Sequence, residues 1–207
     1  MNKPALKIML LLLFSACAFG QEIGVTGIKF WTDNYEVENP TGFGVYGSYP
    51  LGKRINARLE YNYATNKREF FGAVLGGFFP ADPKPLPPEN VESTSTMQVI
   101  DFVLLFQVVN FSYFHFDLGP LAGISFLSGH RKGLESGEKV DLFKQDKWGF
   151  GLALVLGSPD IAGVPLGVNL VYKLKFLRSS SLITDIESPF SDSINISQLQ
   201  LGVSYKF

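Results

Sequence analysis

The sequence predicts an all-β protein, a closed transmembrane β-barrel of eight antiparallel strands in up-and-down order. Three observations indicate this fold: an export signal, period-two alternation of apolar and polar residues, and a final strand that alternates up to a terminal aromatic residue. After residue 21 no segment keeps an apolar period of 3.6 residues or an apolar run long enough for a membrane helix. An alternating strand suits a wall between an apolar solvent and a polar lining, as in a membrane barrel.

The first 20 residues have the organisation of a secretory signal peptide. Lys3 and Lys7 precede an apolar run at residues 8–14, and small residues follow. We expect residues 1–20 to be removed and residues 21–207 to form the barrel. Without these two lysines, the 18 Lys and Arg become 16 against 19 Asp and Glu, a net charge of about −3 that provides no basic field for nucleic acid. Cys17 is either a small signal residue or, alternatively, a lipidation site.

The expected strands are segments in which apolar and polar residues alternate, and turn residues separate one segment from the next. The first two cover residues 24–32 and 42–49, and the third begins at Ile55 and alternates through Tyr63. The later strands are expected at residues 94–109, 111–127, 147–156, 166–176 and 194–207. Most of these segments are long enough for the roughly 9–11 tilted residues of a membrane span. Each has one apolar face and one face richer in small or polar residues.

Long and short connections alternate along the chain. Long loops are expected at about residues 33–41, 65–93, 128–146 and 178–193, and short turns at 50–53, at Asn110 and at 157–165. Outer-membrane barrels place short turns in the periplasm and longer loops outside the cell. The alternation therefore predicts that both termini lie on the periplasmic side.

The closing strand carries a family resemblance. Its outward positions are Leu199, Leu201, Val203, Tyr205 and Phe207. With this ending, the chain from residue 21 onward resembles the small eight-stranded, porin-like outer-membrane β-barrel proteins of Gram-negative bacteria. The resemblance implies a monomer in the outer membrane, contact with its lipids, and recognition of Leu201, Val203, Tyr205 and Phe207 by the barrel-assembly machinery. It implies little about activity, because unrelated functions share this scaffold.

The lumen of such a barrel is just wide enough to be filled by side chains or to hold one small ligand. Charges in it are expected to pair, because an unpaired buried charge costs several kcal/mol. The expected inward set is Lys29, Arg54, Arg58, Glu60, Asp101, His115, Asp117, Lys173 and Lys175. We expect a plug of salt bridges that begins at Arg58 and Glu60, with a narrow polar pathway as the alternative.

His115 and Asp117 point into the lumen together, with Ser125 further along the same face. These residue types occur in acyl-transfer sites, but Ser125 is eight residues, or roughly 26 Å of extended strand, beyond Asp117. We therefore expect no catalytic site here. With only His115 and His130 in the chain and no suitable ligand spacing, we also expect no metal site and no cofactor.

The segment after the third strand is rich in phenylalanine. Phe70, Phe71, Phe78 and Phe79 precede a proline-rich run at residues 80–88. They are expected to extend the third strand, to fold over the barrel mouth, or to form a contact for a ligand or partner. An extra strand at residues 70–79 is a further alternative, which would raise the strand count toward ten.

The predicted function is that of a non-enzymatic outer-membrane protein, either structural or surface-binding through its extracellular loops. A narrow porin-like channel for small solutes is the first alternative, and an acyl hydrolase or transferase of the outer leaflet is the second. A soluble lipocalin-like carrier would also have eight strands and a signal peptide, but it would turn its polar faces outward.

Overall fold

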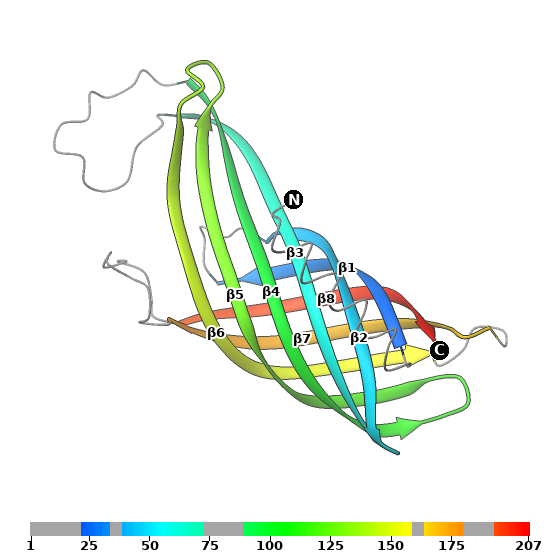
Figure 1. The fold of residues 1–207 in the computed structure, drawn as a ribbon. Helices are drawn as coiled ribbons and strands as arrows, with labels where there is room; N and C mark the ends of the chain where they lie inside the picture. Colours follow the sequence, from blue (N-terminus) through cyan, green and yellow to red (C-terminus); the bar gives the residue numbers. More distant parts are fainter. Residues whose placement is uncertain (1–21, 34–38, 73–88, 159–163, 180–192) are drawn as a thin grey trace.

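The computed structural model shows a closed barrel of eight antiparallel strands joined in chain order (Figure 1). The structure describes residues 22–33, 39–72, 89–158, 164–179 and 193–207. The strands are β1 Glu22–Thr32, β2 Thr41–Gly52, β3 Ile55–Gly72, β4 Glu89–Asn110, β5 His115–Gly133, β6 Lys139–Ser158, β7 Leu166–Ser179 and β8 Ser193–Lys206. The pairing of β1 with β8 closes the ring. The predicted fold class and strand count are confirmed.

The period-two pattern decides which residues face outward. On β8, Leu201 is 62% exposed and Gln200 is fully buried in the lumen. The same alternation holds on β7, where Tyr172 faces outward and Lys173 inward. An outer surface of this kind needs an apolar solvent. In the described ranges, no helix has the length and apolar character needed to cross a membrane.

Four strands, β3 to β6, extend far into the predicted long loops. Residues 65–72 and 89–93 of the predicted loop at 65–93 belong to β3 and β4, which pair up to Gly72 opposite Glu89. The predicted loop at 128–146 is mostly β5 and β6, joined only by residues 134–138. The loop prediction failed because apolar alternation ends at the membrane boundary, whereas backbone pairing continues in water between polar residues.

These extensions form a sheet that rises beyond the ring. The last residue pair of β2 with β3 is Thr41 opposite Thr65, and the last of β6 with β7 is Lys147 opposite Ser179. Beyond those rows β3, β4, β5 and β6 continue together, as the tall group of strands in Figure 1 shows. We call this part, residues 66–72, 89–95, 129–133 and 139–146, the projecting sheet. At about 3.3 Å per residue, β3 gains roughly 23 Å between Thr65 and Gly72.

The opposite end of the barrel also differs from the prediction. β2 continues to Gly52, so its turn lies at Lys53 and Arg54, two residues later than expected. β5 begins at His115 instead of Phe111. The intervening residues form a turn in which the Phe111 N–H donates to the Phe114 carbonyl at 2.8 Å.

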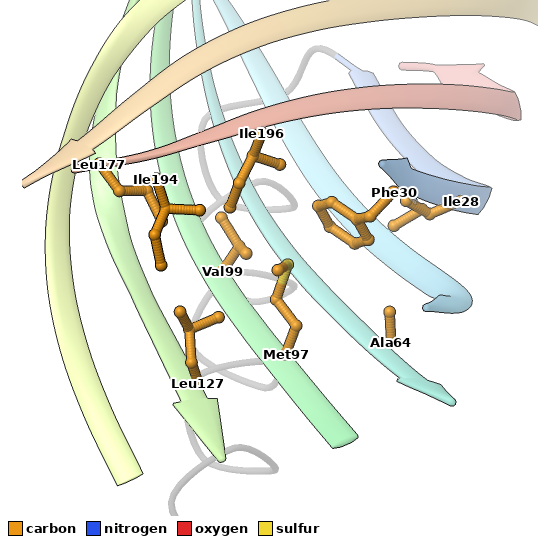
Figure 2. Close-up of a cluster of buried hydrophobic side chains, with 9 residues drawn as sticks. All are labelled: Ile28, Phe30, Ala64, Met97, Val99, Leu127, Leu177, Ile194 and Ile196. Atoms are coloured by element: carbon orange, nitrogen blue, oxygen red, sulfur yellow. The ribbon is translucent and has the colours of Figure 1, made fainter. Parts of the chain in front are cut away.

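Apolar side chains fill two levels of the lumen. The upper apolar cluster, nearer the projecting sheet, contains Ile28, Phe30, Ala64, Met97, Val99, Leu127, Leu177, Ile194 and Ile196, which point toward one another inside the barrel (Figure 2). The lower apolar cluster, nearer the short-turn end, contains Val103, Leu105, Leu121, Ala153, Val155 and Val171. The lumen is therefore less polar than the expected salt-bridge plug alone would make it.

Candidate functional site: the lumen and the projecting sheet

Five charged side chains lie in alternating order across the middle of the lumen: Lys175, Asp101, Lys173, Glu60 and Arg58. Asp101 lies between the two lysines, with its carboxylate 2.6 Å from Lys175 Nζ and 3.1 Å from Lys173 Nζ. Glu60 pairs with Lys173 through one oxygen and lies 2.6 Å from Arg58 Nε through the other. All five residues are at most 5% exposed. We call this set the central charge chain; it ties β7 to β3 and β4 across the lumen.

Neutral groups add further contacts to the central charge chain, in which the buried Arg58 Nη2 has no hydrogen-bond partner. Gln200 Nε2 donates to Glu60 at 3.0 Å, and Lys175 Nζ donates to Ser125 Oγ at 3.3 Å. The Arg58 guanidinium stacks on Tyr46, with Cζ 3.4 Å from the ring centroid. These contacts offset part of the desolvation cost of burying the charges.

The Tyr46 hydroxyl begins a second polar group, which sequence reasoning missed. It donates to Glu22 at 2.9 Å and accepts from Asn169 Nδ2 at 2.6 Å. The Tyr46 side chain is buried in the lumen. The alternation of β2 could have shown this, because Phe43 and Val45, at odd-numbered positions, occupy the outer face of the strand, and Tyr46 lies on the opposite face.

Two residues of the expected inward set lie elsewhere. Arg54 is exposed in the β2–β3 turn, because that turn falls two residues later than predicted. Lys29 lies on the outer side of β1, where its Nζ donates to the Asn39 carbonyl at 3.2 Å. A lysine can cover apolar surface with its stem while its head reaches polar groups at the boundary.

The residues considered for acyl transfer do not form one site. His115 Nε2 lies 3.7 Å from Asp117 Oδ2 near the short-turn end. Ser125 instead accepts a hydrogen bond from Lys175 in the central charge chain. Among the residues that the structure describes, no group of three or more His, Cys, Asp or Glu is arranged to hold a metal ion.

The outer end of the projecting sheet is fastened by Glu89. Its carboxylate accepts hydrogen bonds from the backbone N–H groups of Glu135 and Ser136, each at 2.8 Å, and from Ser136 Oγ at 2.5 Å. The Leu134 N–H donates to the Asn90 carbonyl beside it. The Ser136 hydroxyl and the two backbone donors hold the pKa of Glu89 below its usual range. We call this arrangement the Glu89 clasp; it fixes the β5–β6 tip to β4.

Of the four phenylalanines expected to form a contact, Phe70, Phe71, Phe78 and Phe79, the structure describes the first two, at the outer end of the projecting sheet. Phe70 and Phe71 extend β3, which is one of the alternatives that the sequence left open. Phe70 turns toward the inner side of the sheet, where Arg131 Cζ lies 5.4 Å from its ring centroid. Phe71 is 70% exposed, and Leu134 is also exposed. Phe78 and Phe79 lie outside the described residues, as do most of the other residues proposed for an extra strand.

The expected assembly signal lies on the outer surface at the C-terminus. Leu201, Val203, Tyr205 and Phe207 are all exposed. The Tyr205 and Phe207 rings meet edge to face with centroids 5.0 Å apart. This placement leaves the side chains accessible, and their recognition by the assembly machinery stays a prediction.

A closed ring with an apolar exterior and a side-chain-filled lumen defines a small transmembrane β-barrel. The family model described as "Outer membrane protein beta-barrel domain" matches residues 10–207, so the chain belongs to this family. The resemblance drawn from the closing strand is confirmed. No curated protein sequence matches the chain.

Several solved outer-membrane barrels are similar in fold. Ail, the attachment invasion locus protein of Yersinia pestis, matches with a TM-score of 0.52 at 14% identity, covering 91% of this chain and 97% of that chain. Neisserial surface protein A matches with a TM-score of 0.51 at 13% identity, covering 90% and 96%. A major outer membrane protein from Thermus thermophilus gives 0.52 at 13%, covering 90% and 99%. At these identities the likeness shows the fold alone.

Proposed function

We propose that this outer-membrane barrel is a non-enzymatic, non-conducting protein that acts at the cell surface by binding a partner through its projecting sheet. The observation that carries this proposal is the contrast between a side-chain-filled lumen and a sheet that continues well beyond the ring. The barrel then serves as a membrane anchor, and the binding surface lies on the extracellular side.

The filling of the lumen supports the absence of conduction. The central charge chain lies between the upper and lower apolar clusters, so an ion would have to pass two apolar levels and one level of paired charges. Phe30 and Leu177 are almost completely buried in the upper apolar cluster. An ion crossing such a level would lose its hydration without gaining polar ligands, at a cost of several kcal/mol.

The construction of the projecting sheet supports a binding role. Its outer end is held by the Glu89 clasp, and the ion pair of Lys67 with Glu92, at 3.2 Å, crosses from β3 to β4 lower down. A surface fixed in this way loses little conformational entropy when it binds. Exposed apolar residues far from the membrane, here Phe71 and Leu134, are typical of contact sites.

Planar-bilayer recording tests the first half of the proposal. We expect residues 21–207, refolded in detergent and shown to be folded by heat-modifiable gel migration, to give no discrete openings. Repeated openings of uniform size would overturn this half and favour the narrow channel. An Asp101→Asn variant would then be expected to alter the ion selectivity of those openings.

Adherence of whole cells tests the second half. Bacteria that display the protein are compared with bacteria that lack it on immobilised heparin, on immobilised serum proteins and on a layer of cultured cells. We expect retention on at least one of these surfaces, and its loss in a Phe71→Ser/Leu134→Ser variant. The matched control is Val25→Ser, an apolar-to-serine change on the outer face of β1. Equal retention with and without the protein on every surface would refute the binding role.

A further inference from the structure

The β4–β5 turn at the short-turn end of the barrel is unusually apolar for a connection. Residues 107–114 read Gln-Val-Val-Asn-Phe-Ser-Tyr-Phe and contain no charged side chain. The last pair of β3 with β4 is Ile55 opposite Phe106, so the segment from Val108 onward extends past β3. Val108, Phe111 and Phe114 are all exposed, and Tyr113 is 85% exposed.

The exposed surface of this turn continues the lipid-facing surface of the barrel. Phe102, Phe106 and Val108 follow one another along the outer face of β4 and are all exposed. At the end of that row, the Phe111 and Phe114 rings pack together with centroids 4.8 Å apart. Only one polar pair, Asn110 with His115, lies between the turn and the apolar belt, and no Lys, Arg, Asp or Glu follows Phe106 on the outer face of β4, whereas on the extracellular side Lys67 and Glu69 follow the tyrosines of β3.

The neighbouring β2–β3 turn at the same end has the opposite chemistry. It exposes Lys53 and Arg54, two charges that belong in water. The contrast between an uncharged aromatic turn and a dibasic turn indicates that only the first is suited to a bilayer interface, where amphipathic rings place their polar tips among the headgroups.

We propose that the β4–β5 turn inserts into the phospholipid leaflet at the short-turn end of the barrel, as a membrane anchor beyond the strand ends. Phe111 and Phe114 then contact acyl chains, and the Tyr113 hydroxyl lies among the headgroups. This anchor is independent of the proposed surface-binding function. It fixes the depth of the β4–β5 side of the barrel relative to the β2–β3 side.

Site-directed spin labelling tests the anchor, because residues 21–207 contain no cysteine and each introduced cysteine is therefore unique. Ser112→Cys and Tyr113→Cys are compared with Lys53→Cys, after refolding into phosphatidylcholine–phosphatidylglycerol vesicles. Ser112→Cys keeps every aromatic ring of the turn, so it also controls for loss of Tyr113. Heat-modifiable migration confirms that each labelled variant is folded.

For each label we measure the ratio of its accessibility to dissolved oxygen to its accessibility to a water-soluble nickel chelate. We expect this ratio to be severalfold higher at positions 112 and 113 than at position 53. The same ratio at all three positions would overturn the proposal. That result would place the turn in water, where its exposed rings would be a contact for a periplasmic protein.

Discussion

Replacement of Asp101 by asparagine is expected to destabilise the barrel strongly. The central charge chain holds three cations, Arg58, Lys173 and Lys175, and two carboxylates, Glu60 and Asp101. Asparagine keeps the shape of the side chain but removes one of the two negative charges. Lys175 then keeps only neutral acceptors, such as Ser125 Oγ at 3.3 Å, in a place where it is almost fully buried.

The expected loss can be estimated from the pairing that remains. Breaking a buried ion pair by removing one partner costs about 3–5 kcal/mol, because the other charge stays desolvated. Replacement of Lys173 by methionine should cost less, about 1.5–3 kcal/mol, the value of hydrogen bonds to charged groups. The reason is that Lys173→Met leaves two complete pairs, Lys175 with Asp101 and Arg58 with Glu60.

Equilibrium unfolding in urea, with the protein in phospholipid vesicles and tryptophan fluorescence as the signal, measures both variants. For an m-value of about 1–3 kcal/mol per molar, Asp101→Asn should lower the midpoint by at least roughly 1 M. Arg54→Met is the matched control, since Arg54 is exposed in a turn and should change the free energy of unfolding by no more than about 0.5 kcal/mol. A loss below about 1 kcal/mol for Asp101→Asn, or a larger loss for Lys173→Met, would refute the alternating arrangement.

Three further changes test other parts of the molecule. Phe30→Ala in the upper apolar cluster should cost about 3–5 kcal/mol in the same urea assay, and a value near zero would mean that this level of the lumen is not packed. Gly151→Ala would place a Cβ 1.8 Å from the Leu174 carbonyl oxygen and should cost about 1–3 kcal/mol, whereas Gly52→Ala, whose Cβ would meet nothing within 4 Å, should be neutral. Glu89→Gln should speed amide exchange at the β5–β6 tip at neutral pH. Because the folded-state pKa of Glu89 is lowered, the Glu89 clasp is fully present above the ordinary pKa of 4.5 and is lost as the pH falls through the folded-state pKa. The rate of amide exchange at the wild-type β5–β6 tip, corrected for the intrinsic exchange rate, should therefore rise in that pH range. An exchange rate that does not depend on pH would contradict the Glu89 clasp.

The sequence was sufficient for the architecture because alternation and strand order are local properties. The faces of β3 and β7 follow directly from parity, and so do the inward positions of Arg58, Glu60, Asp101, Lys173 and Lys175. Alternation cannot locate strand ends in water, since a segment such as residues 66–72 has polar residues on both faces and pairs only because β4 lies beside it. The projecting sheet was therefore predicted as loops.

The side-chain contacts of the central charge chain and of the Glu89 clasp could not be predicted from the sequence, because they depend on how the strands are arranged in the closed ring. Glu60 and Lys173 are 113 positions apart in the chain, and their pairing depends on β3 and β7 lying across the lumen from each other. The partners of Glu89 could not be found from sequence either, because two of its three donors are backbone N–H groups of a turn. Only the Ser136 hydroxyl is a side-chain signal, and nothing in its spacing points to Glu89.

The pairing pattern also locates the outer surface of the membrane. Inside the hydrocarbon every backbone N–H and C=O must be paired, so the ring must be complete wherever lipid touches it. β3 loses β2 beyond Thr65, and β6 loses β7 beyond Lys147. Among the residues that the structure describes, the β2–β3 and β6–β7 ladders end at these rows, so the closed ring of strands ends there as well. The exposed Trp148 lies next to one of these rows, as expected for a ring at the lipid–water boundary. The hydrocarbon therefore ends at or below these rows, and the projecting sheet lies wholly outside it.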